Sequence, residues 1–447
     1  MPYDTAAGDT LDALLAHARA FGAESADASL SQSESLSVDV RMGAFEGVER
    51  SESRSVGLRT FIGKRQAGAT TSDLSADGLK ALAERVVAMA KLAPEDPYCG
   101  LLDASERTTS FPELDTYDDT RLDAAALEAM AQEAESAALA VAGVTNSSGA
   151  GASWSAGQVA LRTSDGFVGF SRATSFGVGV SPIAERDGKM ERDYEGRSKR
   201  FLAELPSSQS MGQIAGERAV ARLGSRKIES RKATVIFENR VASRIVGPAL
   251  GAISGAAVAR GVSFLKDKLG AQVFAKGVVI EDDPFRARGM ASRPFDGEGA
   301  AGVKRNLFDD GVLTTWLMNA SAARQLGLKS TGHASLGHGG PPGISSSNVT
   351  LLPGDRDLAA LMADAGEGIV VTEMFSPSLN GNNGDWSVGF SGYWFEKGER
   401  AFPVSEITVA GNLLDIYARL VPGADLERRG SFDAPSILVD DLAVAGV

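Results

Sequence analysis

Three histidines and one cysteine are the residues of this 447-residue chain best suited to hold a transition metal. His333 and His338 lie five residues apart in the glycine-rich stretch STGHASLGHGG, whereas His17 and Cys99 lie far away in the N-terminal part. Protein zinc sites use three or four His, Cys or carboxylate ligands, and this stretch contains no Asp or Glu. The sequence therefore predicts no metal ligands in this chain and a structural or solvent-contacting role for both histidines.

Two pairs of carboxylates could in principle perform acid–base chemistry. Asp282 and Asp283 precede a proline, and Asp309 and Asp310 precede a glycine. Asp is favoured beside turns because its side chain hydrogen-bonds to nearby backbone groups. The G-x-S-x-G pattern of a serine nucleophile occurs nowhere in the chain. We therefore predict no catalytic residue.

A third polar segment has the composition of a peptide-binding loop. Residues 378–385 read SLNGNNGD, so amides, glycines and one carboxylate are grouped within eight residues. Such groups can pair with an extended peptide, and glycine allows the two backbones to approach closely. Turn chemistry accounts for the same residues. The candidate peptide contacts are Asn380, Asn382, Asn383 and Asp385, together with His333.

The elements before residue 226 predict two units of helices packed on antiparallel strands. In the first unit, residues 1–93, we expect helices at 10–22 and 75–92 and strands at 26–41, 56–62 and 65–71. Residues 94–119 form a proline- and Asp-rich linker. In the second unit, residues 120–225, we expect helices at 123–142 and 210–223, a flexible loop at 147–157, and strands at 159–163, 166–180 and 186–194.

Residues 226–447 predict a strand-rich domain. Its clearest element is GYWFEKGERAFPVSEITVAG, residues 392–411, in which two alternating segments flank a tight turn and predict a buried hairpin. Many short strands separated by glycines indicate a barrel-like or sandwich architecture, with helices at 239–253, 320–326 and 411–420. The fold class predicted for the whole chain is α+β.

The hairpin sequence, the stretch TGHA at 331–334 and the segment NGNNGD at 380–385 also resemble the TldD/PmbA family, in particular its PmbA (TldE) branch. This resemblance implies that a catalytic sister, TldD, carries an H-E-x-x-x-H zinc motif on the helix after the first strand of its C-terminal domain. In this chain the equivalent helix follows residues 233–237 and has Arg240, Arg244 and Gly247 among the corresponding positions. Arginine cannot lose its proton to ligate zinc.

The resemblance implies a role as a subunit of a TldD/TldE metallopeptidase that cleaves unfolded or modified peptides, with the zinc held by the TldD-like partner. The chain alone is then expected to be inactive and to carry no cofactor. The alternative is a non-catalytic peptide-binding or scaffolding homodimer that acts without a partner.

Composition limits the partners further. The net charge is −13 and the pI is about 4.9, which argues against direct nucleic-acid binding because phosphates are neutralised by basic surfaces. The first residues lack the basic and apolar segments of a signal peptide, and residues 245–262 are too rich in glycine and alanine to insert into a membrane. We expect a cytoplasmic protein.

Overall fold

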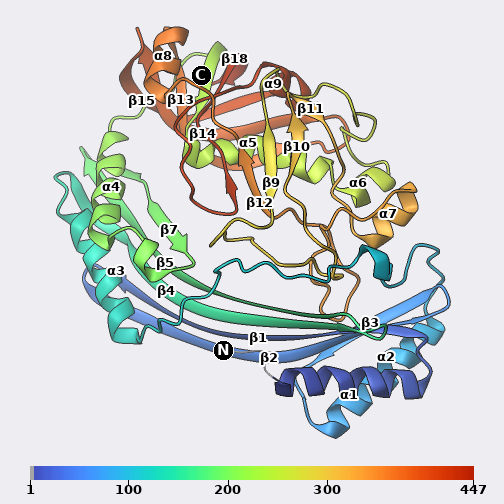
Figure 1. Cartoon of the computed structure of the whole chain (residues 1–447). Coiled ribbons are helices and arrows are strands. Elements are labelled where there is room, and N and C mark those ends of the chain that lie inside the picture. Colours follow the sequence, from blue (N-terminus) through green and yellow to red (C-terminus); the bar gives the residue numbers. More distant parts are fainter. Residues whose placement is uncertain (1–4) are drawn as a thin grey trace.

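The computed structural model describes residues 5–447 and has an α+β fold. A long, curved antiparallel sheet forms the N-terminal half, and the C-terminal half lies over its concave side (Figure 1). Helices cover the convex side. None of the helices within residues 5–447 is both long and apolar enough to cross a membrane.

The N-terminal sheet is continuous across both predicted units. Its strand order is β3-β2-β1-β4-β5-β6, and β7 also pairs with β5. The bounds are β1 Ser25–Arg41, β2 Ala44–Ile62, β3 Arg65–Thr71, β4 Val144–Thr163, β5 Val168–Arg186, β6 Lys189–Arg192 and β7 Glu195–Lys199. The pairing of β1 with β4 joins the units, with Ser35 opposite Ser155. The prediction of a flexible loop at 147–157 is wrong, because these residues lie within β4.

Polar side chains cap the first turns of helices in this half. Ser75 accepts a hydrogen bond from Gly78 N at the start of α2, and Asp123 accepts one from Ala126 N at the start of α3. The helices are α1 Thr5–Phe21, α2 Ala76–Leu92, α3 Ala124–Leu139 and α4 Ser208–Ala221, with short 3-10 turns η1 Ala104–Glu106 and η2 Leu202–Glu204. Two apolar cores lie under these helices, one containing Leu30 of β1 and the other Val38 of the same strand.

The C-terminal half contains a closed barrel, as predicted. The strands β15, β14, β13, β8 and β18 are neighbours in that order, and β15 also pairs with β18, which closes the ring. The bounds are β8 Arg231–Phe237, β13 Glu367–Leu379, β14 Asp385–Glu396, β15 Glu399–Asn412 and β18 Ile437–Ala445, with the short β16 Val421–Pro422 paired to β18. Closure leaves these strands few free edges.

A smaller sheet and the remaining helices pack around the barrel. The sheet has the order β11-β10-β9-β12-β17, formed by β9 Ile280–Asp283, β10 Arg305–Asp309, β11 Val312–Leu313, β12 Asn348–Leu351 and β17 Phe432–Asp433. The helices are α5 Asn239–Ala252, α6 Gly255–Ala259, α7 Ala320–Leu326, α8 Leu358–Ala365 and α9 Leu413–Arg419. One large apolar core joins α5 to both sheets.

The hairpin predicted at 392–411 is present as β14 and β15. Lys397 and Gly398 form its turn and both have positive φ, 54° and 76°. Trp394 and Phe395 of β14 are buried, whereas Arg400 and Ala401 of β15 are exposed. Both faces are therefore covered along β14 but not at the start of β15.

Candidate functional site

A face of small polar residues runs along the concave side of the N-terminal sheet. Alternate residues of β1 from position 29 to position 37 are all serine, and alternate residues of a strand share one face. The intervening Leu30 and Val38 lie in the apolar cores under the helices. The serines therefore point away from the helices, toward the C-terminal half.

Neighbouring strands continue this surface. Ser35 lies opposite Ser51 of β2 and Ser155 of β4, and Ser155 lies opposite Ser175 of β5. We call the whole surface the serine face; its members are Ser29, Ser31, Ser33, Ser35 and Ser37 of β1, Ser51, Ser53 and Ser55 of β2, Ser153, Ser155 and Gly157 of β4, and Ser171, Ser175 and Gly177 of β5.

The serine face deepens into a trough beside β7. Asp39, Gly151, Gly179 and Gly196 lie opposite one another on four consecutive strands. Two hollows of about 630 and 550 Å³ share these four residues and form one continuous depression. A Cβ atom at Gly151 would lie 2.6 Å from Oδ1 of Asp39, so a larger residue there would displace this exposed carboxylate and raise the floor. The trough exposes backbone as well as side-chain polar groups.

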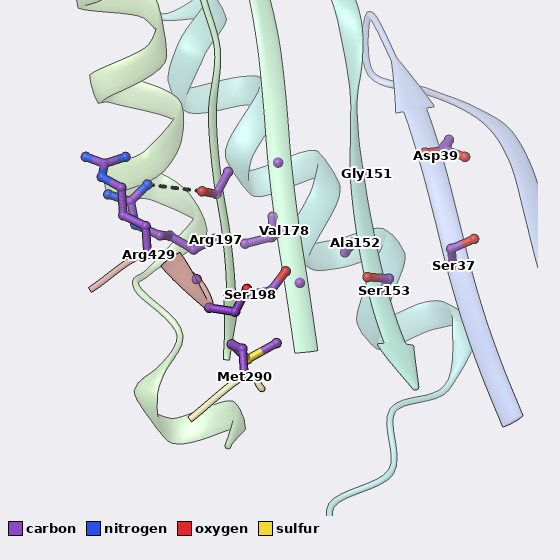
Figure 2. A pocket seen from close by; sticks show the side chains of 15 residues that line it. Ser37, Asp39, Gly151, Ala152, Ser153, Val178, Arg197, Ser198, Met290 and Arg429 are labelled. Carbon is purple, nitrogen blue, oxygen red and sulfur yellow. Dashed lines mark hydrogen bonds between the residues drawn. The ribbon is translucent and has the colours of Figure 1, made fainter. Parts of the chain in front are cut away.

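The C-terminal half supplies one wall of the trough. Figure 2 shows Met290 and Arg429 beside Arg197 and Ser198 of β7, with Ser37 and Ser153 on the strands beyond. The larger hollow therefore combines segments that are far apart in the sequence, whereas the smaller hollow is lined by residues of the N-terminal half alone.

Ion pairs hold this wall in place. Glu195 is buried and accepts hydrogen bonds from Arg197, from Arg218 at 2.5 Å and from Arg429 at 3.4 Å. Glu427 pairs with Arg197 and Arg429 as well. Burial raises the pKa of Glu427, but the hydrogen bond from Arg197 and the charge of Arg429 outweigh this and leave its pKa below the usual range. Since each of these arginines has a carboxylate partner, the wall carries little uncompensated positive charge.

Helix α5 is where the sequence resemblance would place zinc ligands, and its residues do not fit a metal. The Arg240 side chain is 5% exposed and donates hydrogen bonds to Asp193 and Glu238. Burial lowers the pKa of the Arg240 guanidinium, and the bonds and charges of Asp193 and Glu238 more than reverse that effect, so the group stays positively charged. Arg244 donates to the carbonyl of Met374 at 3.0 Å. Two fixed guanidinium groups would repel a divalent cation.

His333 lies in a closed hydrogen-bond network rather than on a surface. Its Nε2 is 3.1 Å from Oδ2 of Asp282 and its Nδ1 is 2.9 Å from Oγ1 of Thr331. Asp282 also accepts hydrogen bonds from the backbone and hydroxyl of Ser347. Burial raises the pKa of Asp282, but its bonds to His333 and Ser347 bring the pKa below the usual range. His333 is 2% exposed, so peptide contact by this residue stays a prediction that requires the network to open.

The asparagine-rich segment forms the exposed turn between β13 and β14. Asn380 Oδ1 accepts from the backbone of Asn382, and Asn383 Nδ2 donates to Asp385 at 2.7 Å. Asn412 donates to Asp385 at 3.0 Å and so fixes the turn to β15. Asn380, Asn382, Asn383 and Asp385 are thus brought together, but their bonds and those of His333 share no partner within residues 5–447. A role for this turn in peptide binding stays a prediction.

His338 closes the far end of the serine face. Its Nδ1 is 3.0 Å from the hydroxyl of Ser29 and its Nε2 is 2.9 Å from that of Ser55. A Cβ at Gly57 would lie 2.4 Å from the backbone nitrogen of Gly339, so the loop rests directly on the sheet. Burial lowers the pKa of the imidazole. Within residues 5–447, no three His, Cys, Asp or Glu side chains are grouped as metal ligands would be.

Comparisons with known proteins agree with this architecture. Residues 230–446 match the model of the PmbA/TldA metallopeptidase C-terminal domain, residues 26–90 match domain 1, and residues 117–223 match the central domain. Metalloprotease PmbA of Escherichia coli O157:H7 is 34% identical over 425 residues, which is 95% of this chain and 92% of that protein. The PmbA homologue of Haemophilus influenzae is 33% identical over 94% of this chain and 92% of its own length.

Two crystal structures share the fold over nearly the entire chain. A Bacteroides thetaiotaomicron protein described as a modulator of DNA gyrase has a TM-score of 0.92 at 25% identity and covers 100% of both chains. TldE from Thermococcus kodakarensis has a TM-score of 0.89 at 17% identity, over 98% of this chain and 100% of that one. At that identity the second similarity concerns the fold alone.

Proposed function

This chain belongs to the PmbA/TldD metallopeptidase family, and we propose that it acts as the non-catalytic, peptide-holding subunit of a two-subunit metallopeptidase. In this proposal a TldD-like sister supplies the zinc and the hydrolytic step. The substrate is an unfolded or modified polypeptide, held in the trough and along the serine face. The site of action is the cytoplasm.

The trough is the observation that carries the proposal. From Ser29 to Ser37 the serine face spans roughly 26 Å at about 3.3 Å per residue, the length of about eight extended residues of a bound peptide. Serine hydroxyls both donate and accept hydrogen bonds, and the glycine row lets a peptide backbone approach the strands. Few apolar or unpaired charged groups line this surface, so binding would depend on the peptide backbone more than on its side chains.

Helix α5 supports the assignment of the chemistry to a partner. Zinc in a peptidase lowers the pKa of a bound water and so provides the nucleophile. Arg240 is committed to Asp193 and Glu238, and Arg244 to a backbone carbonyl, so this helix offers no deprotonated ligand. The acid or base chemistry of the reaction is likewise assigned to the sister subunit.

The test is a cleavage assay with fluorescein-labelled unfolded casein. The chain alone should release no more label than buffer does. After mixing with a relative that carries H-E-x-x-x-H, cleavage should appear and should stop on addition of a chelator. Chelator-sensitive cleavage by this chain alone would contradict the proposal.

Two leucine variants separate peptide holding from mere assembly. Ser153 is exposed in the trough, whereas Ser210 is exposed on helix α4. Ser153→Leu should lower kcat/KM of the mixture by about tenfold or more while Ser210→Leu leaves it unchanged. Equal effects of both variants would remove the trough from the proposal. Binding of casein without cleavage in the mixture would instead favour a stand-alone peptide-binding protein.

A further inference from the structure

The two long edges of the N-terminal sheet differ in how completely other segments cover them. On one side, β5 is covered by β6 and β7, and farther along by residues 116–118, where Thr174 N donates to the carbonyl of Thr116 at 3.0 Å. On the other side, β3 covers β2 only from Val56 to Ile62. Within residues 5–447, no strand or backbone group is bonded to the outer edge of β2 between positions 44 and 55. Unpaired strand edges of this length are sites of pairing with another chain.

The hairpin that follows shows which backbone groups point outward along this edge. Gly63 and Lys64 form a two-residue turn, so Ile62 and Arg65 exchange both of their backbone hydrogen bonds. Hydrogen-bonding direction alternates along a strand, so the even-numbered residues of β2 face β3 and, beyond its end, face solvent. The outward N–H and C=O groups of the open segment therefore belong to Val48, Arg50, Glu52 and Arg54.

We propose that this edge binds the same edge of a second copy of the chain, antiparallel and with a two-fold axis through Ser51. In that register Arg50 lies opposite Glu52 of the second copy, and Val48 lies opposite Arg54. All of these are outward-facing residues, so each pair can exchange backbone hydrogen bonds. Ser51 lies opposite its own equivalent, which places no bulky or charged pair on the axis.

Charge and the extent of the free edge select this register. An axis through Ser53 would place Glu52 opposite Arg54. It would also place Arg50 opposite Val56, which already pairs with β3, so only residues 51–55 could join. An axis through Arg50 places Arg50 opposite itself, and axes through Glu49 or Glu52 do the same for a carboxylate. Like charges directly opposite destabilise a strand pair, whereas opposite charges stabilise it. Arg50 and Glu52 already pair within one chain at 2.5 Å, but both side chains are more than 60% exposed and free to exchange partners with a second copy. The pattern is therefore complementary to itself about Ser51.

Two further observations agree with a covered edge. Phe45 and Val48 are 51% and 52% exposed on the convex side of this segment, and pairing would place the aliphatic stem of Arg54 against Val48. A two-fold axis perpendicular to the sheet keeps each face on its own side. The two serine faces would then meet at Ser51 and Ser53 and form one surface of double width. This inference concerns the chain by itself and does not depend on the proposed peptidase partner.

The test uses charge reversal in the full chain, followed by sedimentation velocity over a range of concentrations. The wild-type protein should dimerise. Arg50→Glu places two carboxylates opposite each other at both symmetric positions, and Glu52→Arg does the same with two guanidinium groups. Each single variant should raise the dimer dissociation constant by about tenfold or more. Lys80→Glu, at an exposed position of helix α2, is the matched control and should have no effect.

Mixing makes the test specific for this register. An Arg50→Glu chain paired with a Glu52→Arg chain has opposite charges at both positions, so an equimolar mixture should dimerise as tightly as the wild type. The double variant R50E/E52R should do so by itself. A wild-type protein that stays monomeric, a dimer unaffected by both single variants, association only with a different protein, or a mixture that stays monomeric would each overturn the inference.

Discussion

The serine face and the charge cluster around helix α5 are both polar, and both lie between the two halves of the molecule. In the cluster, Asp193 is 2% exposed and is bonded to Arg240 and Arg222, and Arg222 also reaches Glu373. On the serine face, Ser33 and Ser153 are exposed and keep hydroxyl groups open to solvent. The difference separates polar groups that hold the fold from polar groups that remain available to a ligand.

Burial explains why the cluster must be closed. Removing a charge from water costs several kcal/mol unless a partner and further hydrogen bonds replace the lost hydration. Burial raises the pKa of Asp193, but its bond and charge interaction with Arg240 bring the pKa below the usual range. Serine hydroxyls at a solvated surface carry no such requirement. Substitutions should therefore cost much stability in the cluster and little on the serine face.

The largest effect is expected for Arg240→Ala. This change leaves the buried carboxylate of Asp193 with the backbone N–H of Tyr194 at 2.7 Å and with Arg222 at 3.5 Å as its remaining charged partner, and breaking one side of a buried pair costs about 3 to 5 kcal/mol. Urea unfolding should show a loss of that size. The matched control is Arg356→Ala, whose ion pairs with Asp355 and Asp364 are exposed and should contribute less than about 1 kcal/mol. Equal losses would mean that burial does not distinguish the two sites.

A pH-dependent effect is expected at Glu298, which lies at the same interface. The side chain is 6% exposed and accepts a hydrogen bond from Ala320 N. Burial raises the pKa of Glu298 to about 7, against a partial lowering by Arg59. The folded protein then binds a proton more tightly than the unfolded chain, so the contribution is fully present below about pH 4.5 and is lost as the pH rises through about 7.

Glu298→Gln should remove that pH dependence. Relative to the variant, the wild-type protein should lose roughly 2 to 3 kcal/mol of unfolding free energy between about pH 4.5 and pH 8, since one pKa unit corresponds to about 1.4 kcal/mol. Urea unfolding at several pH values measures this difference. A constant difference between the two proteins across this range would show that Glu298 is ionised in the folded state.

A smaller effect is expected where the His338 loop rests on the serine face. Gly57→Ala would force a Cβ to within 2.4 Å of the backbone of Gly339, and overpacking of this kind costs about 1 to 3 kcal/mol. Because the loop is able to shift, we expect Gly57→Ala to lower the free energy of unfolding by about 1.5 kcal/mol. Gly47→Ala on the same strand has no atom within 4 Å of the new Cβ and should be neutral. Similar unfolding curves for the two variants would mean that the loop is not seated on the sheet.

Local chemistry in the sequence predicted much of the fold. The helix starts predicted at 75 and 123 and the tight turn predicted within 392–411 depend on neighbouring residues. The structure has all three: α2 and α3 begin one residue later, and the turn is at Lys397 and Gly398. Segment 147–157 was misassigned because its glycines and serines are typical of loops. In β4 those small residues serve the opposite purpose, since they keep one face of a strand free of bulk.

The candidate site was harder to predict because it depends on pairing between distant strands. Alternating serines from Ser29 to Ser37 are visible in the sequence, but only the register of β1 with β4 shows that Ser153 and Ser155 extend them. His333 and Asp282 are 51 residues apart in the sequence, and Arg240 and Asp193 are 47 residues apart, so no local sequence pattern predicts these hydrogen bonds. Sequence chemistry correctly identified unusual residues, whereas their partners required the tertiary structure.

The smallest effect, an absence of any change, is expected when zinc is added. A metal that binds only the folded state stabilises it by mass action and so raises the melting temperature. When the free metal concentration is about one hundred times the dissociation constant, the stabilisation is about 2.7 kcal/mol. The carboxylates nearest to α5 are already bonded to Arg240 and Arg222, and zinc would have to displace those guanidinium groups. We therefore expect no shift in melting temperature and no stoichiometric zinc by elemental analysis.

Unfolded casein, which would bind the open hydroxyls of the serine face, should raise the melting temperature in the same assay. One tightly held zinc per chain, or a zinc-dependent shift that Asp193→Asn abolishes, would show that the cluster is open to ligands and would end the distinction between the two regions.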